Sequence, residues 1–194
     1  MGIILQIHYT TSVKGFLAEK EGIGGLFAYI FMRETSGTAG YEEDMHMIAL
    51  ASDHTGIEMK KEIMKMLDEM GLEWKDFGTN EPVSCDYPIY GYRAAKAVAD
   101  GECDRGILIC GTGIGIGIAA SKVKGIRVCT CSDVYSAELS KRHNNSQILT
   151  MGARVVGVDL AKMIAKHWLT AEFEGGRHQR RVDMITAIEN GEAF

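Results

Sequence analysis

The chain has 194 residues, of which 46% are hydrophobic and 24% charged, a composition typical of a soluble globular protein with one domain or at most two small ones. The formal net charge of -5 disfavours general attraction to nucleic acid or to an anionic membrane. The sequence has no apolar run of about 18 residues, so we expect neither a membrane partner nor a nucleic-acid partner.

The cysteine and histidine patterns indicate the cellular compartment and whether a metal is bound. Five cysteines occur without a Cys-x-x-Cys motif, which is typical of reduced thiols, and we therefore expect a cytoplasmic protein. The six histidines show no His-x-x-x-His or paired-carboxylate spacing typical of metal ligands. We expect neither a metal nor any other cofactor.

Residues 1–46 differ in pattern from the rest of the chain. They are rich in Gly and Thr, with short apolar patches that match no long amphipathic helix. We interpret them as an N-terminal extension outside the main fold, explained by translation from a start codon upstream of Met45 or Met47. An added interaction segment is the alternative. The expected organisation is an extension at 1–46 and a main domain at 47–194.

From Met47 onward, strand-like and helix-like segments alternate. The predicted strands are 47–52, 72–77, 106–110, 126–131 and 147–151. The predicted helices are 57–70, 89–99, 114–122, 134–142, 158–169 and 181–189. This order indicates an α/β fold, a three-layer α/β/α Rossmann-like sandwich with a five-stranded parallel sheet.

Ligands of such sheets bind beyond the carboxyl ends of the strands. The loops expected to line the site are therefore 52–56, 78–87, 110–115, 131–134 and 151–154.

The most informative segment is 107–117, Ile-Leu-Ile-Cys-Gly-Thr-Gly-Ile-Gly-Ile-Gly, in which a buried strand runs into alternating glycines and then a helix. Glycines permit a tight turn with inward-pointing N–H groups, and the helix start adds partial positive charge. The segment is therefore suited to holding an anion.

Three interpretations of this loop are open. It can be a packing turn without a ligand. It can be a dinucleotide fingerprint, because 115–120 fits G-x-G-x-x-A and Asp133 follows, although this match begins five residues past the strand. The third interpretation starts from Cys110, since a thiol facing a helix N-terminus is expected to ionise readily. A base beside N–H groups is what enolisation requires: the base removes a carbon-bound proton, and the N–H groups hold the enediolate oxygen.

Six motifs occur in one order along the chain. They are Ser52-Asp53-His54-Thr55-Gly56, Asp86-Tyr87-Pro88, Cys110-Gly-Thr-Gly-Ile-Gly, Arg142-His143-Asn144-Asn145, Gly152-Ala-Arg154-Val-Val-Gly157 and Gly175-Gly-Arg177-His178-Gln179-Arg180-Arg181-Val182. In these residues, from about Met47 to Glu189, the chain resembles type B ribose-5-phosphate isomerase. The resemblance does not extend to residues 1–46.

The resemblance implies a role for each matched residue. Cys110 would shuttle a proton between C1 and C2 of the sugar with help from Thr112, His143 would open the sugar ring, and Asp53 would lie near the sugar hydroxyls. A branch of the family with a carboxylate in the loop has it where this chain has Ile116, which favours the cysteine variant. The substrate-binding residues implied are His54, Tyr87, Gly111, Gly113, Gly115, Asn144, Arg154, Arg177 and Arg181.

Within this set, the amides of the three glycines would stabilise the enediolate. His54 and the arginines would bind the phosphate, whose oxygens match guanidinium forks. Structural explanations stay open beside these roles. Asp53 and His54 can cap the next helix, Tyr87 can be an aromatic at a helix start, His143 can be a polar helix end, and the C-terminal arginines can be a solvated face.

The expected function is an aldose-ketose isomerase that interconverts ribose 5-phosphate and ribulose 5-phosphate. Alternatives are an isomerase of allose 6-phosphate, galactose 6-phosphate or a tetrose phosphate, and a non-catalytic module that binds a sugar phosphate or nucleotide. Such a module should not need both Cys110 and His143. The resemblance also implies an obligate homodimer, or a tetramer, whose active sites are completed by the neighbouring subunit's C-terminal arginines. The sequence does not rank His178 and Arg180.

Overall fold

The computed structural model describes residues 47–192, and the expectations about 1–46 lie outside the described residues. Five parallel strands form one sheet in the order β2-β1-β3-β5-β4. The strands are β1 (Ile48–Ser52), β2 (Trp74–Asp76), β3 (Arg105–Cys110), β4 (Val128–Thr130) and β5 (Ile148–Gly152). The helices are α2 (Ile57–Glu69), α3 (Tyr87–Ala99), α4 (Ile114–Ala120), α5 (Val134–Asn144), α6 (Val158–Thr170) and α7 (Arg177–Glu189).

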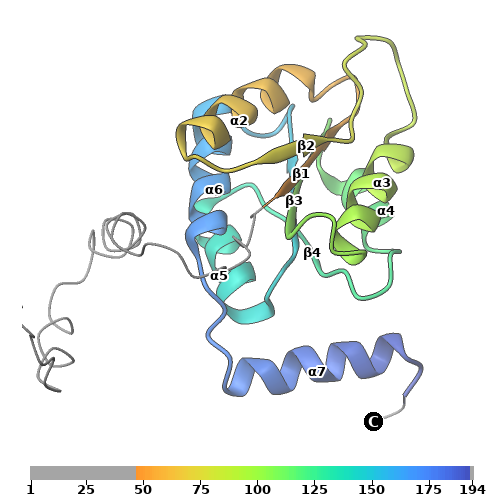
Figure 1. The fold of residues 1–194 in the computed structure, drawn as a ribbon, viewed down its shortest axis with the longest axis vertical. Helices are drawn as coiled ribbons and strands as arrows, with labels where there is room; N and C mark the ends of the chain where they lie inside the picture. Colours follow the sequence, from red (N-terminus) through yellow and green to blue (C-terminus); the bar gives the residue numbers. More distant parts are fainter. Residues whose placement is uncertain (1–46, 193–194) are drawn as a thin grey trace, which may run out of the picture. The chain divides into compact units, whose positions relative to one another are not determined.

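Helices cover both faces of the sheet (Figure 1). Alternate residues of β1 and β3 point into two separate hydrophobic cores, as the two-residue period of a strand requires. One core joins the sheet to α2, α5 and α6, and the other joins it to α3 and α4. The predicted three-layer α/β/α sandwich with a five-stranded parallel sheet is confirmed.

The element bounds differ from the expected ones at a few ends. α7 begins at Arg177 rather than 181, directly after Gly176, whose φ of 54° lies in the left-handed region. α3 begins at Tyr87, so Pro88 lies in its first turn, where the missing amide costs no hydrogen bond. No helix in residues 47–192 is long and apolar enough to cross a membrane.

The chain changes direction across the sheet between β1 and β3. After β1 the chain adds β2 on one side, and after β2 it returns to add β3 on the other. Such a switch point leaves a place for a ligand beyond the carboxyl ends of the two strands. The strand ends are level there, because Ser52 pairs with Ile109 and Cys110 pairs with Gly152. The loops after β1, β3 and β5 therefore meet at one edge.

The larger core can be tested at its one fully buried indole. Trp168 is 0% exposed and its Nε1 donates to Ser146 Oγ at 2.8 Å. Trp168→Phe removes this donor and leaves a void, and we expect it to lower the free energy of unfolding by about 2–3 kcal/mol. Denaturant unfolding measures the loss.

Trp74→Phe is the matched control. Trp74 is half-buried, and its Nε1 donates to Asp68 Oδ1 at 2.8 Å in an exposed pair. Water can replace that donor, so we expect a loss below about 1 kcal/mol. Equal losses for the two variants would contradict this account of the core.

Candidate active site

Cys110 is the last residue of β3 and lies beneath the glycine loop that follows it. It is 4% exposed, and the Gly113 amide donates to its Sγ at 3.2 Å. The Gly113 N–H is therefore directed at the thiol, whereas the sequence interpretation directs it at a substrate oxygen. The amide of Ile114 donates to Thr112 Oγ1 at 3.3 Å, which fixes the exposed Thr112 over the same turn.

Two glycines of this loop are required by the space around them. Gly113 has a φ of 78°, and a Cβ there would lie 2.7 Å from the backbone carbon of Met151. A Cβ at Gly115 would lie 2.6–2.8 Å from the ring of Tyr87. The Tyr87 ring thus lies directly against the loop, which supports its interpretation as a wall of the site.

Asp53 and His54 follow β1 at the same edge. Asp53 is 5% exposed, and its amide donates to the carbonyl of Ile109, next to Cys110. Its Oδ1 accepts from both the amide and the hydroxyl of Thr55, at 2.9 and 2.6 Å. The alternative role of Asp53 as a cap of α2 is not what the structure shows, because the cap residue is Gly56 and no side chain caps that helix.

His54 is partly buried and accepts a hydrogen bond from the amide of Cys85, which donates to Nδ1 at 3.3 Å. Cys85 Sγ lies 3.7 Å from the same nitrogen. The loop between β2 and α3 thus reaches the end of β1.

Arg154 joins this group from the loop after β5. Its amide donates to the carbonyl of Gly111 at 3.0 Å, and a Cβ at Gly111 would lie 3.8 Å from its Cδ and Nη1. The same Cβ would lie 3.7 Å from Thr55 Oγ1. A guanidinium, a hydroxyl and a backbone turn therefore surround one small space beside Gly111. We call Asp53, His54, Tyr87, 110–115 and Arg154 the carboxyl-edge group.

The remaining residues predicted for the site lie in another part of the fold. They are His143, Asn144, Arg177 and Arg181. α5 starts after β4 at the carboxyl edge and ends at Asn144, just before β5 starts at the opposite edge. Its 11 residues span about 16 Å. α6 returns in the same way, and Arg105, the first residue of β3, donates to the carbonyl of Leu169 near its end. Figure 1 shows α7 at the bottom of the view, below the sheet, and the loop after β2 at the top.

A second group of residues lies around Glu174, and we call it the amino-edge group; its members are Arg142, His143, Glu174, Arg177, His178 and Arg181. The rings of His143 and His178 stack with centroids 4.2 Å apart and planes inclined by 4°. The Nε2 atom of each ring lies 3.7 Å from Glu174 Oε2. Arg142 donates to Glu174 Oε1 at 2.8 Å, which is the main reason that the pKa of Glu174 lies below its ordinary value.

The electrostatics of the amino-edge group are dominated by positive charge. Burial, and then the charges of His143, Arg177 and Arg181, lower the pKa of His178, although Glu174 opposes them. His178 Nε2 accepts a hydrogen bond from Arg177 Nε at 3.3 Å, which requires that this nitrogen carries no proton. Two guanidiniums beside two imidazoles suit a phosphate or another anion.

The same group satisfies one geometric condition for a cation site. His143, Glu174 and His178 each offer a ligand atom, and these atoms lie within 4.8 Å of one another. However, Arg177 already donates to His178 Nε2, and Arg142 pairs with Glu174. Ligand atoms that are engaged by arginines, in a positive field, disfavour a cation. We assign no metal to this group.

Sequence reasoning overlooked several contributors. Thr55 holds Asp53, Cys85 holds His54, and a carboxylate oxygen of Glu174 lies beside the Nε2 atoms of both stacked histidines. An Asp followed two residues later by Thr is a recognisable turn signal. No local pattern marks the pair of Glu174 with Arg142, which lies 32 residues away on α5, and its nearer partner His178 is at the start of α7. His178, which the sequence left unranked, proves to be buried against His143.

The carboxyl-edge group can perform general base chemistry on an anionic, hydroxylated ligand. A thiol polarised by an amide can exchange a proton, a turn of peptide groups can face developing negative charge, and a guanidinium can bind an anion. The amino-edge group supplies histidines and further guanidiniums. One chain keeps the two groups at opposite edges of its sheet.

Known proteins match the described domain along almost their whole length. A family model described as Ribose/Galactose Isomerase matches residues 48–185. Ribose-5-phosphate isomerase B of Escherichia coli K12 is 55% identical over 145 residues, which cover 75% of this chain and 97% of that protein. D-erythrulose-4-phosphate isomerase of Pectobacterium atrosepticum is 44% identical over 152 residues, covering 76% of this chain and 98% of that protein.

The fold agrees with these matches. A structure of ribose-5-phosphate isomerase B from Clostridium thermocellum superposes with a TM-score of 0.74 at 52% identity, covering 75% of this chain and 98% of that one. The resemblance carried by the six motifs is confirmed, and the chain belongs to the ribose/galactose isomerase family.

Proposed function

We propose that this protein interconverts ribose 5-phosphate and ribulose 5-phosphate through an enediolate. The E. coli relative at 55% identity bears the name of that activity. The observation that carries the proposal is the position of the Cys110 thiol at the end of β3. Its sulfur accepts a hydrogen bond from the Gly113 amide of the glycine loop that follows. Arg154 beside Gly111 provides a counter-charge for a phosphate at the same edge.

The proposed reaction moves hydrogen within one molecule. His143 takes the proton of the C1 hydroxyl and delivers one to the ring oxygen as the bond between C1 and that oxygen breaks, which gives the aldehyde form with its acidic C2–H. The Cys110 thiolate removes the C2 proton, the electron pair forms the C1–C2 double bond, and the carbonyl oxygen becomes the enediolate oxygen. The thiol then returns the proton to C1, and a proton shift between the two oxygens gives the ketose. No net oxidation occurs, so no redox partner is needed.

The positions of the two groups lead to a homodimer with shared active sites. Within one chain, His143 and the C-terminal arginines lie at the amino edge, whereas Cys110 lies at the carboxyl edge. A second copy can bring its amino-edge group to the first chain's Cys110, and twofold symmetry then completes two identical sites.

Exposed apolar side chains support this pairing. On α3 and α4, Tyr92, Ile114 and Ile118 are 54%, 56% and 56% exposed, and on α7 Ile185 and Ile188 are 44% and 61% exposed. Exposed apolar residues of this size are suited to a surface that a second copy covers.

A second candidate substrate is a tetrose phosphate. The relative from P. atrosepticum, named D-erythrulose-4-phosphate isomerase, shares 44% identity along 98% of its length. Both activities use the same enediolate chemistry, so the thiol and the loop do not discriminate between them. The two substrates differ in the length of the sugar that spans the thiol and the phosphate-binding arginines, so this length discriminates between them.

We place the protein in the cytoplasm. The described part of the chain contains five free cysteines, of which Cys103, Cys110 and Cys131 are buried. Unpaired thiols persist best in a reducing compartment such as the cytoplasm.

Substrate length can be tested directly. Phosphorylated aldoses with four, five and six carbons are compared by kcat/KM with the purified protein. We expect ribose 5-phosphate to exceed allose 6-phosphate, galactose 6-phosphate and erythrose 4-phosphate by at least about tenfold, because a misplaced phosphate loses about 1.4 kcal/mol or more of transition-state binding. A higher kcat/KM for the tetrose would assign the second activity instead.

The shared site can be tested with Cys110→Ala and His143→Ala. Each homodimer is expected to lose at least about 100-fold in turnover, because each lacks one proton-transfer group. A heterodimer with one substitution on each chain, isolated with two affinity tags, restores one intact site. Its turnover should be about half that of the unsubstituted dimer.

The matched control carries both substitutions on one chain and none on the other. With shared sites, this heterodimer has a defect in both sites and should be inactive. Sites contained in single chains would give the reverse result, half activity here and none in the first heterodimer. That pattern would reject the shared site.

A further inference from the structure

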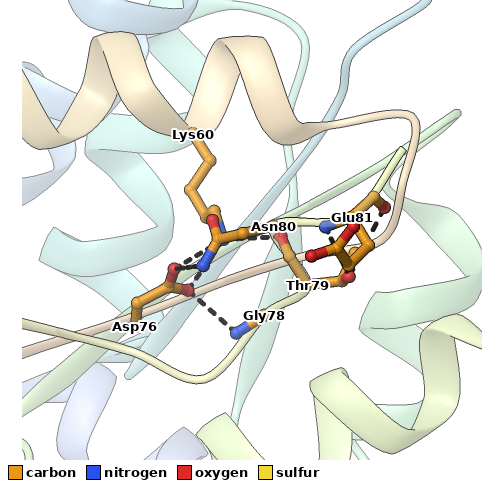
Figure 2. A network of polar contacts seen from close by, with 6 residues as sticks. All are labelled: Lys60, Asp76, Gly78, Thr79, Asn80 and Glu81. Atoms are coloured by element: carbon orange, nitrogen blue, oxygen red, sulfur yellow. Dashed lines mark hydrogen bonds and ion pairs between the residues drawn. The ribbon is translucent and has the colours of Figure 1, made fainter. Parts of the chain in front are cut away.

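Lys60 is a lysine whose charge is fully removed from water, although it lies outside both groups described above. It sits on α2 and is 0% exposed. Its Nζ donates to Asp76 Oδ1 and Oδ2 at 2.8 and 2.7 Å, to the carbonyl of Thr79 at 2.9 Å, and to Asn80 Oδ1 at 3.1 Å. Figure 2 shows these partners converging on the ammonium from the end of β2 and the turn after it.

Asp76 extends the network into the turn. Its Oδ1 accepts from the amide of Gly78 at 2.9 Å, and its Oδ2 accepts from Asn80 Nδ2 at 3.2 Å (Figure 2). The four acceptors of the Lys60 ammonium are thus all in residues 76–80, which we call the anchored turn. A buried ammonium with four acceptors at these distances holds that turn in one position, because any shift leaves a charge unpaired.

The anchored turn lies against the end of β1, immediately before Asp53 and His54. The Thr79 amide donates to the carbonyl of Ser52 at 3.0 Å. A Cβ at Gly78 would lie only 2.3 Å from the backbone nitrogen of Ser52. The two backbones are therefore in direct contact, and the position of the turn is tied to that of the strand end.

The same loop ends at His54. Residues 81–84 are exposed, and the next residue, Cys85, donates its amide to His54 Nδ1 at 3.3 Å. A nitrogen that accepts this bond carries no proton, so the neutral imidazole has its hydrogen on Nε2. His54 is then a donor through Nε2 to whatever lies on its other side.

We propose that Lys60 is a positioning residue: by fixing the anchored turn, it holds the Cys85 amide on Nδ1 of His54 and presents the His54 Nε2–H to an anionic oxygen of the substrate. The identity of that oxygen as a sugar phosphate depends on the proposed function, whereas the ring geometry does not. Lys60 itself does not touch the substrate. It acts through the loop whose first turn it anchors.

The first measurement uses the unsubstituted protein. Nitrogen-15 NMR of histidine-labelled protein distinguishes the two neutral tautomers, and the His54→Gln protein identifies the His54 signals. We expect the form protonated at Nε2, both without ligand and with inorganic phosphate. A His54 protonated at Nδ1 would overturn the proposal without any change to Lys60 and without reference to activity.

The second measurement uses Lys60→Met, which keeps the length of the aliphatic stem but removes the ammonium. We expect a mixture of His54 tautomers and a KM for ribose 5-phosphate raised about tenfold, with kcat changed less than about twofold, since one donor to the anion is misplaced. Asp76→Asn, which keeps the side-chain shape, is scored in the same way if Lys60→Met does not fold.

Lys61→Met is the matched control. Lys61 lies next to Lys60 on α2, is exposed, and pairs with Glu58 at 2.8 Å at the surface. It should leave the His54 signals and KM unchanged. A folded Lys60→Met or Asp76→Asn protein with an unaltered His54 tautomer and KM would show that the network serves stability alone. Altered His54 signals in a protein that turns over no sugar phosphate would support the positioning and reject the proposed function.

Discussion

In a parallel sheet, the carboxyl ends of all strands lie at one edge, and each crossover helix returns the chain to the opposite edge. This constraint divides the residues expected in the site into two groups. Asp53, Cys110 and Arg154 lie at or just after strand ends at the carboxyl edge, whereas His143 lies in the last turn of α5 and Arg177 begins α7 at the amino edge. Neither group alone contains the thiol, His143 and all the guanidiniums that were expected in the site. The proposed homodimer therefore rests on the strand order.

The carboxyl edge owes its detail to backbone contacts rather than to long side chains. Gly113 adopts a positive φ so that its amide reaches the sulfur of Cys110, and Gly115 leaves room for the Tyr87 ring. The amides of Ala153 and Arg154 donate to the carbonyls of Cys110 and Gly111, which joins the loops after β3 and β5. Fixed peptide dipoles around a base need little reorganisation when charge develops on a substrate.

The fold was predictable because its signals are local. Apolar runs and helical stripes located the strands and helices of residues 47–192 to within a few residues, and the alternating glycines after 107–110 marked the loop that covers Cys110. The start of α7 was expected at residue 181 because 177–181 is a run of polar residues without an apolar stripe. The helix begins at Arg177, directly after Gly176, which is its N-cap and has a positive φ. Position along the chain also predicted that Asp53, Cys110 and Arg154 would share an edge.

The sequence could not supply the polar pairs that form across the chain. Lys60 follows Met59, an apolar residue of the predicted helix 57–70. Lysines are almost never fully buried, so the burial of Lys60 against Asp76 was unexpected. The stack of His143 on His178 joins residues 35 positions apart and depends on how the 171–176 segment turns. The loops predicted to line the site already left out residue 143, and only the resemblance to a family grouped His143 with Cys110.

The central claim is that one ligand contacts the thiol of one chain and the histidine of another. A crystal structure with an unreactive open-chain five-carbon sugar phosphate tests this most directly. We predict that Cys110 Sγ of one protomer faces C1 and C2 of the ligand while the partner subunit's His143 and Arg177 contact the same molecule. A ligand held by a single chain, or bound away from Cys110, would contradict the account.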